Sequence, residues 1–183
     1  TTHCLTQTQF ENIMFAFGSP NYGTQRSLCF NAMITAFLLT YGIEEPARNY
    51  DDVEFILMVG RNMMEAISTS ETSELSHAID RGAKLVYLDP RFTKTAAKAA
   101  EWIPIRPGTD SAFLLAMINV IVTNELADCD FVKQYVLGCD DIKDAMSQYT
   151  PAWAEGITGV PAADIERIAR EYAAAKHNAL AHP

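Results

Sequence analysis

Residues 84–110 read KLVYLDPRFTKTAAKAAEWIPIRPGTD and place two polar loops directly after two short apolar segments. The first segment, Leu85–Leu88, is rich in strand formers and ends at Asp89-Pro90, because proline has no N–H to continue a β-ladder. The second segment is Trp102–Ile105, and Thr109-Asp110 then predicts the start of a helix. We therefore expect both polar loops at the carboxyl ends of strands, where ligands bind in open α/β sheets.

The segment before this stretch predicts how the strands are arranged. Residues 54–59, EFILMV, form a nearly continuous apolar run that ends at Gly60, which is typical of a strand buried on both faces. Residues 70–81 have the pattern of a helix. Together with the strand at 85–88 they make a β-α-β crossover of about the usual ~30 residues, which makes the two strands parallel. The sequence thus predicts an α/β fold, a three-layer, Rossmann-like parallel sheet flanked by helices.

Apolar residues at helical spacing extend this prediction in both directions along the chain. Two helices are expected before the sheet, one ending near Gly18 and one over residues 30–41. After Asp110 the pattern is helical throughout, and Gly156–Pro161 predicts a turn before the last helix, whose apolar stripe contains Ile165. We therefore expect a helix-rich C-terminal part.

Composition excludes several classes of function. The chain has 183 residues, 49% of them hydrophobic, which is enough for one globular domain spanning residues 1–183. Its net charge of −9 argues against nucleic acid as a partner, which needs a basic surface. The chain shows no signal segment and no transmembrane segment, so a soluble chain is expected. Its four cysteines have no zinc or iron–sulfur ligand spacing, whereas disulfides stay open.

The common nucleotide-binding motifs are absent, since the sequence has neither G-x-G-x-x-G nor G-x-x-x-x-G-K-[ST]. The loop after the first strand is instead VGRNMME at residues 59–65. Its Gly60 lets the backbone approach a phosphate closely, and Asn62 can donate and accept hydrogen bonds. Taken alone, such a loop is more often an ordinary glycine turn.

Four separated motifs in order carry a resemblance to a known family: GSPNYGTQRSLC at 18–29, VGRNMME at 59–65, DPRFTKTA at 89–96 and IPIRPGTD at 103–110. Together they resemble the molybdopterin oxidoreductases of the dimethyl sulfoxide reductase family. Within that family the chain looks most like the catalytic subunits of thiosulfate and polysulfide reductases. The resemblance implies a domain that binds one of two molybdopterin guanine dinucleotides, which hold a molybdenum ion.

The resemblance also implies particular contacts. Residues 59–65 would meet the diphosphate and sugar, residues 89–93 the ribose and guanosine, and residues 108–110 the guanine. The implied cofactor contacts are Gln25, Gly60, Arg61, Asn62, Met63, Glu65, Asp89, Pro90, Arg91, Thr93, Gly108, Thr109 and Asp110.

Each of the main candidates also has a structural interpretation. The Asp110 carboxylate can accept hydrogen bonds from N1–H and the exocyclic amine of guanine, a pair that adenine lacks, or it can simply complement a helix start. Asp89 can bind ribose hydroxyls or form an Asx turn before Pro90. Loop arginines such as Arg91 can neutralise a diphosphate or can be solvated.

Cys29 would be the metal ligand by resemblance. It precedes a predicted helix, whose N-terminus and nearby Arg26 favour the thiolate form, and Arg26 would steer an anionic substrate. Without the resemblance, Cys29 would be expected to be a small buried apolar residue.

The resemblance further implies that the chain is an internal fragment of a larger catalytic chain. The parent would carry an iron–sulfur cluster outside this segment and work with an iron–sulfur electron-transfer subunit and a membrane anchor subunit, in the periplasm or cell envelope. Its substrate would be an inorganic sulfur compound, with formate, nitrate, tetrathionate or an arsenic oxyanion as alternatives. The isolated fragment is predicted to be inactive. The competing hypothesis is a non-catalytic α/β module that binds a nucleotide or a protein partner.

Overall fold

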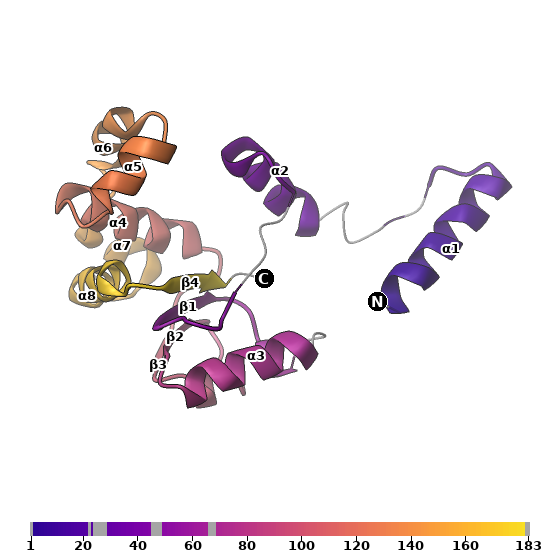
Figure 1. Ribbon diagram of the computed structural model, residues 1–183, viewed down its shortest axis with the longest axis horizontal. Helices are drawn as coiled ribbons and strands as arrows, with labels where there is room; N and C mark the ends of the chain where they lie inside the picture. The colour runs from indigo at the N-terminus through magenta and orange to yellow at the C-terminus, as the bar shows by residue number, and fades with distance from the viewer. Residues whose placement is uncertain (1, 22, 24–28, 45–48, 66–68, 182–183) are drawn as a thin grey trace. The chain divides into compact units, whose positions relative to one another are not determined.

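The computed structural model describes residues 2–21, 23, 29–44, 49–65 and 69–181. The chain divides into two compact units, residues 1–48 and residues 49–183. Among the described residues, the first unit contains two helices and the second contains the β-sheet with its flanking helices (Figure 1). The assignment of residues 1–183 to a single cofactor-binding domain stays a prediction.

The described part of the first unit contains α1 (Thr2–Phe17) and α2 (Cys29–Tyr41), and both helices were predicted from the sequence. They leave large apolar side chains exposed: Phe17 is 83% exposed and Leu39 is 82% exposed. Among the described residues, no helix is long and apolar enough to cross a membrane.

In the described part of the second unit, four strands form one parallel sheet. They are β1 (Phe55–Val59), β2 (Lys84–Leu88), β3 (Glu101–Ile103) and β4 (Asn178–Ala181), in the spatial order β3-β2-β1-β4. Every pair of neighbours is parallel, and Val59 lies opposite Leu88 while Leu88 lies opposite Ile103. The crossover helix α3 (Thr69–Asp80) connects β1 to β2, which confirms the predicted β-α-β unit.

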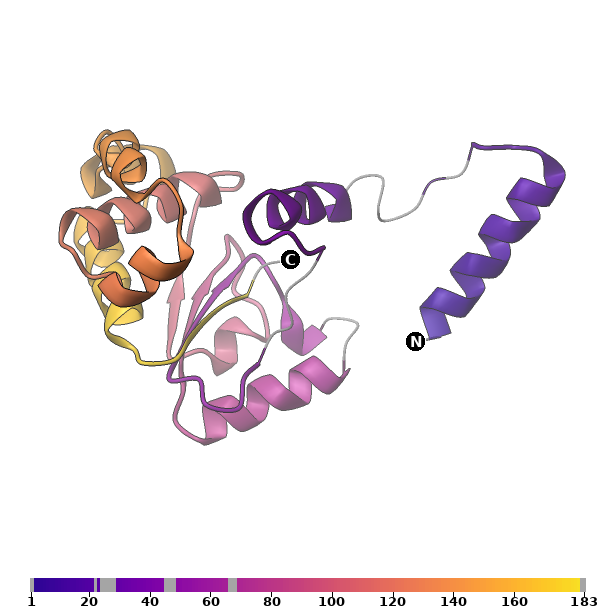
Figure 2. The ribbon, with the colours of Figure 1, turned by 45° about the horizontal axis from the view of Figure 1, so that its top comes forward.

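Helices cover both faces of this sheet. Side chains alternate along each strand, so Leu57 and Val86 enter one core while Ile56 and Tyr87 enter the other. The first core is completed by α4 (Asp110–Thr123), α7 (Pro151–Thr158) and α8 (Ala162–Ala174), and the second by α3. Figure 2 shows α3 on the face opposite α4 and α8. The predicted three-layer α/β fold is confirmed.

Two shorter helices lie outside α4. They are α5 (Cys129–Tyr135), whose first turn is capped by the Asp128 carboxylate, and α6 (Cys139–Met146). The Asn119 amide in α4 donates to the Met146 carbonyl over 2.7 Å and ties the end of α6 to the core. Two short 3-10 turns, η2 (Met63–Glu65) and η3 (Ala96–Lys98), follow β1 and β2. The helix-rich C-terminal part is therefore confirmed.

An ion-pair cluster closes the amino edge of the sheet, where the strands begin. Lys84 starts β2 and Glu101 starts β3, while Arg167 and Glu171 come from α8. The Arg167 guanidinium donates to Glu101 (Nη1 to Oε2, 3.1 Å) and to Glu171 (3.2 Å). The Lys84 ammonium lies 2.6 Å from the Glu171 carboxylate. These charges neutralise one another and fasten α8 to the ends of two strands.

The structure differs from the sequence prediction in three places. Strand β4, with the sequence NALA, was missed because it has no β-branched or aromatic residue and forms only through pairing with β1. Gly156 lies inside α7 rather than in a turn, which begins at Gly159 after the helix ends at Thr158. The strand expected over 102–105 is β3, Glu101–Ile103.

Candidate functional site

The loops that follow β1, β2 and β3 leave the sheet at one edge. Because the strands are parallel and in register, their carboxyl ends lie side by side. The Gly60 N–H donates to the Leu88 carbonyl over 2.8 Å, and the Asp89 N–H donates to the Ile103 carbonyl over 3.3 Å. The segments 59–65, 89–96 and 103–110 thus begin at a common edge, which we call the carboxyl edge.

The first two of these loops are joined by Thr95. Its hydroxyl donates to the Asn62 side-chain oxygen over 2.9 Å and accepts from the Met64 N–H over 3.0 Å. Thr95 is fully buried. An ion pair of 3.0 Å between Lys94 and Glu65 adds a second link at the surface. The loops after β1 and β2 therefore form one connected structure.

Asp89 is held at the centre of the carboxyl edge. Its carboxylate accepts from the Tyr87 hydroxyl (Oδ2, 2.7 Å) and from the Arg91 N–H (Oδ1, 2.7 Å), and the residue is only 7% exposed. The hydrogen bond from the Arg91 N–H to the Asp89 carboxylate forms an Asx turn across Pro90. A carboxylate has about four acceptor positions, so each oxygen keeps capacity for a further hydrogen bond.

Tyr87 is a buried residue that sequence reasoning missed. The Thr93 hydroxyl donates to the Tyr87 hydroxyl over 3.2 Å, and Tyr87 in turn donates to Asp89. Burial is the largest cause that raises the pKa of Tyr87 to about 12; the hydrogen bond from Thr93 opposes the rise and the bond to Asp89 adds to it. Side chains two residues apart in a strand point to the same face. The spacing of Tyr87 and Asp89 could therefore have indicated that their side chains lie close together.

The three arginines of these loops have different surroundings. Arg61 forms an ion pair with Glu71 of α3. The Arg106 guanidinium donates to the carbonyls of Gly156 (2.8 Å) and Ile157 (3.1 Å) at the end of α7, which is a helix-capping contact. Arg91 is exposed. Of the three, Arg91 is therefore the one best placed to meet an anion.

The other predicted contacts of the first loop are partly engaged within the protein. The Met63 side chain is fully buried in the core beside α3. The Asn62 amide donates to the Glu65 carboxylate over 2.5 Å. Hydrogen bonds from Asn62 and Lys94 lower the pKa of the exposed Glu65 below its usual value. In this structure, a ligand on this loop would meet Gly60 and the outer atoms of Asn62 and Glu65 before it met Met63.

The third loop leads into α4. Gly108 has a φ of +76° and no atom within 4 Å of where a Cβ would lie, so its backbone is open to close approach. Gly60 has a φ of +62°. The Thr109 hydroxyl donates to the Arg106 carbonyl over 2.7 Å and does not cap the helix. Asp110 is half-buried in the first turn of α4.

The predicted residues of the first unit are described only in part. Gln25 and Arg26 lie outside the described residues. The sequence predicted that Cys29 precedes the helix, whereas the structure makes it the first residue of α2; its side chain is outside what is described. Their assigned roles stay predictions.

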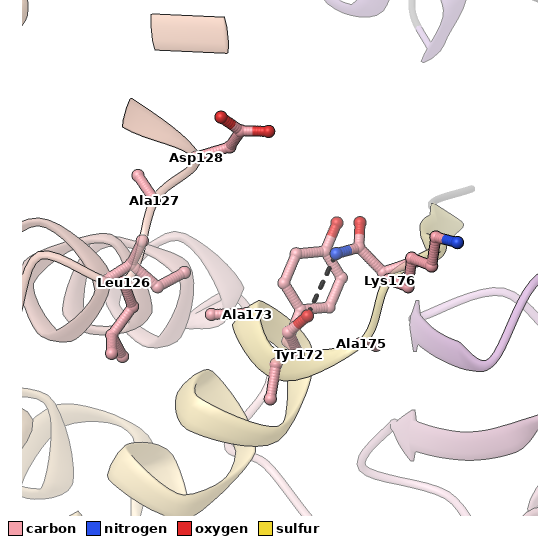
Figure 3. Close-up of a pocket in the computed structure, with 10 residues that line it drawn as sticks. Leu126, Ala127, Asp128, Tyr172, Ala173, Ala175 and Lys176 are labelled. Atoms are coloured by element: carbon pink, nitrogen blue, oxygen red, sulfur yellow. Dashed lines mark hydrogen bonds between the residues drawn. The ribbon is translucent and has the colours of Figure 1, made fainter. Parts of the chain in front are cut away.

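A separate cavity of about 630 Å³ lies near the end of α8 and the start of β4, on the amino side of the sheet. Figure 3 shows Asp128 and Lys176 beside it together with Tyr172. The Asn178 amide donates to the Tyr172 carbonyl over 3.0 Å, and the Asp128 carboxylate caps α5. Since none of the residues that line this cavity was predicted to bind cofactor, we do not place the functional site here.

Comparison with known proteins agrees with these observations. The sequence matches the molybdopterin oxidoreductase family over residues 4–157. It is 38% identical over 168 residues to the thiosulfate reductase molybdopterin-containing subunit of Salmonella typhimurium, covering 92% of this chain and 22% of that protein. It is 34% identical over 168 residues to acetylene hydratase of Syntrophotalea acetylenica, again covering 92% of this chain and 22% of that protein.

A solved structure is also similar to this chain. Acetylene hydratase from Pelobacter acetylenicus matches with a TM-score of 0.79 at 32% identity, over 92% of this chain and 23% of that one. The chain therefore spans about a fifth of the length of these relatives. The sequence, the fold and the motifs at the carboxyl edge show that this chain belongs to the molybdopterin oxidoreductase family.

Proposed function

We propose that this chain binds the guanine dinucleotide part of a molybdopterin cofactor within a larger oxidoreductase. The observation that carries the proposal is the carboxyl edge itself, where Thr95 joins two loops and Asp89 is fixed beside them. Ligands of open α/β sheets bind outside this edge. Membership of the family implies a molybdenum–pterin cofactor, and the guanine dinucleotide form is our proposal.

The residues present fit such a group. Gly60 and Gly108 let the backbone approach phosphate or base closely, because both have positive φ. Arg91 supplies an exposed cation for a diphosphate in a chain whose net charge is −9. The carboxylates of Asp89 and Asp110 accept from ribose hydroxyls and from guanine N–H groups, respectively. When bound, the cofactor supplies two-electron redox chemistry at its metal; this chain's residues bind and orient its nucleotide end.

Cys29 is proposed as the metal ligand and Arg26 as a residue that guides an anionic substrate. Cys29 begins α2, and a helix N-terminus favours the thiolate over the thiol. In the parent enzyme, Cys29→Ala should abolish activity and lower molybdenum content, whereas Cys129→Ala, an exposed cysteine of α5, should do neither. Retained metal and activity in Cys29→Ala would refute this assignment.

The proposed substrate is thiosulfate or polysulfide, reduced by two electrons. It is supported by the 38% identity to a protein named as a thiosulfate reductase subunit. Formate, nitrate, tetrathionate and arsenic oxyanions are the alternatives, because substrate choice depends on side chains from the rest of the parent chain. A similar protein is named a hydratase, which illustrates that this domain alone does not fix the reaction.

The parent enzyme is further proposed to work with an iron–sulfur electron-transfer subunit and a membrane anchor in the cell envelope. The thiosulfate reductase relative is itself named as one subunit. Because the 168 aligned residues correspond to 22% of that relative, we expect this chain to lack the second half of a cofactor pocket. The chain on its own should therefore be catalytically inactive.

Nucleotide selectivity tests the proposal directly. Calorimetric titration of the 183-residue chain should show GDP binding more tightly than ADP, and Asp110→Asn should reduce that preference by roughly tenfold or more, since it removes a charged acceptor. Asp128→Asn is the matched control, because Asp128 also begins a helix but lies at α5. Equal affinity of the wild-type chain for GDP and ADP, or no binding of either, would contradict the proposal.

A further inference from the structure

The Asp89 carboxylate is fixed more firmly than an Asx turn requires. The turn itself uses only the Arg91 N–H, over 2.7 Å to Oδ1. The second oxygen is held by the Tyr87 hydroxyl over 2.7 Å, and the Asp89 carbonyl accepts from the Trp102 indole N–H over 2.9 Å. Both the backbone and the side chain of Asp89 are thereby restrained.

We propose that Tyr87 is a positioning residue that orients the Asp89 carboxylate toward the two hydroxyls of a bound ribose. The inference rests on the proposed nucleotide-binding function and adds the residue that makes Asp89 selective for a ribonucleotide. Neither the sequence motifs nor the resemblance assigned a role to Tyr87.

The position of Tyr87 gives its hydroxyl a fixed location. Its ring is fully buried in the core that α3 covers, where Leu75 and Ala78 are also buried. Because that core is closely packed, the ring keeps one rotamer. Asp89 lies two residues further along the strand direction and on the same face, so the hydroxyl reaches its carboxylate without strain.

The direction of the hydrogen bond is also determined. A hydroxyl has one proton, and the Tyr87 oxygen already accepts from the Thr93 hydroxyl over 3.2 Å. The Tyr87 proton therefore points to Asp89. Since burial raises the pKa of Tyr87 to about 12, the hydroxyl keeps this proton, and remains a donor, at every physiological pH.

Two acceptor positions remain on the restrained carboxylate. Tyr87 and Arg91 use one position on each oxygen, out of about four in total. A vicinal diol presents two donors that match one free position on each oxygen. A 2′-deoxyribose presents only one of them. The arrangement therefore distinguishes the two sugars, provided that the carboxylate is prevented from rotating.

The test compares GDP with 2′-deoxy-GDP on the 183-residue chain by calorimetry. The wild-type chain should prefer GDP by on the order of tenfold, because the deoxy sugar leaves a charged acceptor without its partner. Tyr87→Phe, which removes only the hydroxyl, should lose most of that preference. Val86→Ala is the control, since Val86 is fully buried in the opposite core and should lower stability while keeping the preference.

A double-variant cycle separates positioning from general destabilisation. Asp89→Asn alone should remove the preference, and adding Tyr87→Phe should change it no further. If Tyr87→Phe folds poorly, Thr93→Val, which removes the donor to Tyr87, should weaken the preference in the same direction.

Each outcome has one meaning. A Tyr87→Phe chain that still prefers GDP over 2′-deoxy-GDP would overturn this inference. If the same chain also prefers GDP over ADP, the proposed nucleotide-binding function is still supported. A wild-type chain that binds no guanine nucleotide would overturn both.

Discussion

The two edges of the parallel sheet differ in how their charged groups are used. At the amino edge, Lys84, Glu101, Arg167 and Glu171 neutralise one another. At the carboxyl edge, Asp89 is held by uncharged donors and Arg91 is exposed. Charges that already neutralise one another have little capacity left to bind a ligand. A fixed carboxylate beside an exposed cation keeps that capacity. This difference supports a stabilising role for the amino edge and the proposed binding role of the carboxyl edge.

The largest expected effect separates binding from stability. Asp89→Asn should weaken GDP binding by roughly ten- to a hundredfold, because hydrogen bonds to a charged group contribute about 1.5–3 kcal/mol. Glu101→Gln at the amino edge should leave GDP binding unchanged. Calorimetric titration of both variants measures this. Comparable losses in the two variants would erase the distinction between the edges.

A smaller effect is expected on stability at the amino edge. Arg167→Met removes one of the two cations that the Glu101 and Glu171 carboxylates share, the other being Lys84, and should cost about 1 kcal/mol after allowance for solvent screening. For a chain of this size that lowers the Tm by about 2–4 °C. Arg170→Met, which loses a more exposed pair with Glu166, should cost less. Urea unfolding that ranked the two variants in the opposite order would contradict the proposed role of the cluster.

The smallest effect is on the acid limit of stability. Burial acts to raise the pKa of Glu171, but hydrogen bonds from Lys84 and Arg167 outweigh it and hold the pKa below the usual 4.5. A lowered pKa in the folded state contributes stability above pH 4.5 that is lost as the pH falls through the folded value. Glu171→Gln should therefore flatten the stability curve below pH 4.5. An unchanged acid limb in this variant would show that Glu171 does not contribute there.

The elements that the sequence predicted are those with a strong local pattern. The apolar run before Gly60 and the Asp89-Pro90 stop gave β1 and β2, and helical spacing gave α2 and α3. Strand β4 was missed because its strand state depends on its neighbour β1 rather than on its own residues. The local sequence pattern therefore predicts a helix or strand where that element has enough apolar residues of its own.

The candidate site was predictable to a similar extent. The loops were located correctly because strand direction alone places them at one edge. The partners within that edge were not predictable: Arg61 pairs with Glu71, Arg106 caps α7, and Thr95 bridges two loops. These contacts depend on how segments that are not adjacent in the sequence come together in the fold, which a single sequence does not report.

The unequal covering of the two sheet faces has a consequence for amide hydrogen exchange. Within the described residues, α3 is the helix that closes the core around Tyr87, whereas α4, α7 and α8 share the other core. The layer with less cover should open more readily and exchange its amide protons faster. A nucleotide seated on Asp89 would be linked through Tyr87 to that layer, so its binding should slow exchange in α3 more than in α8. The ligand would then stabilise the less covered layer of the fold.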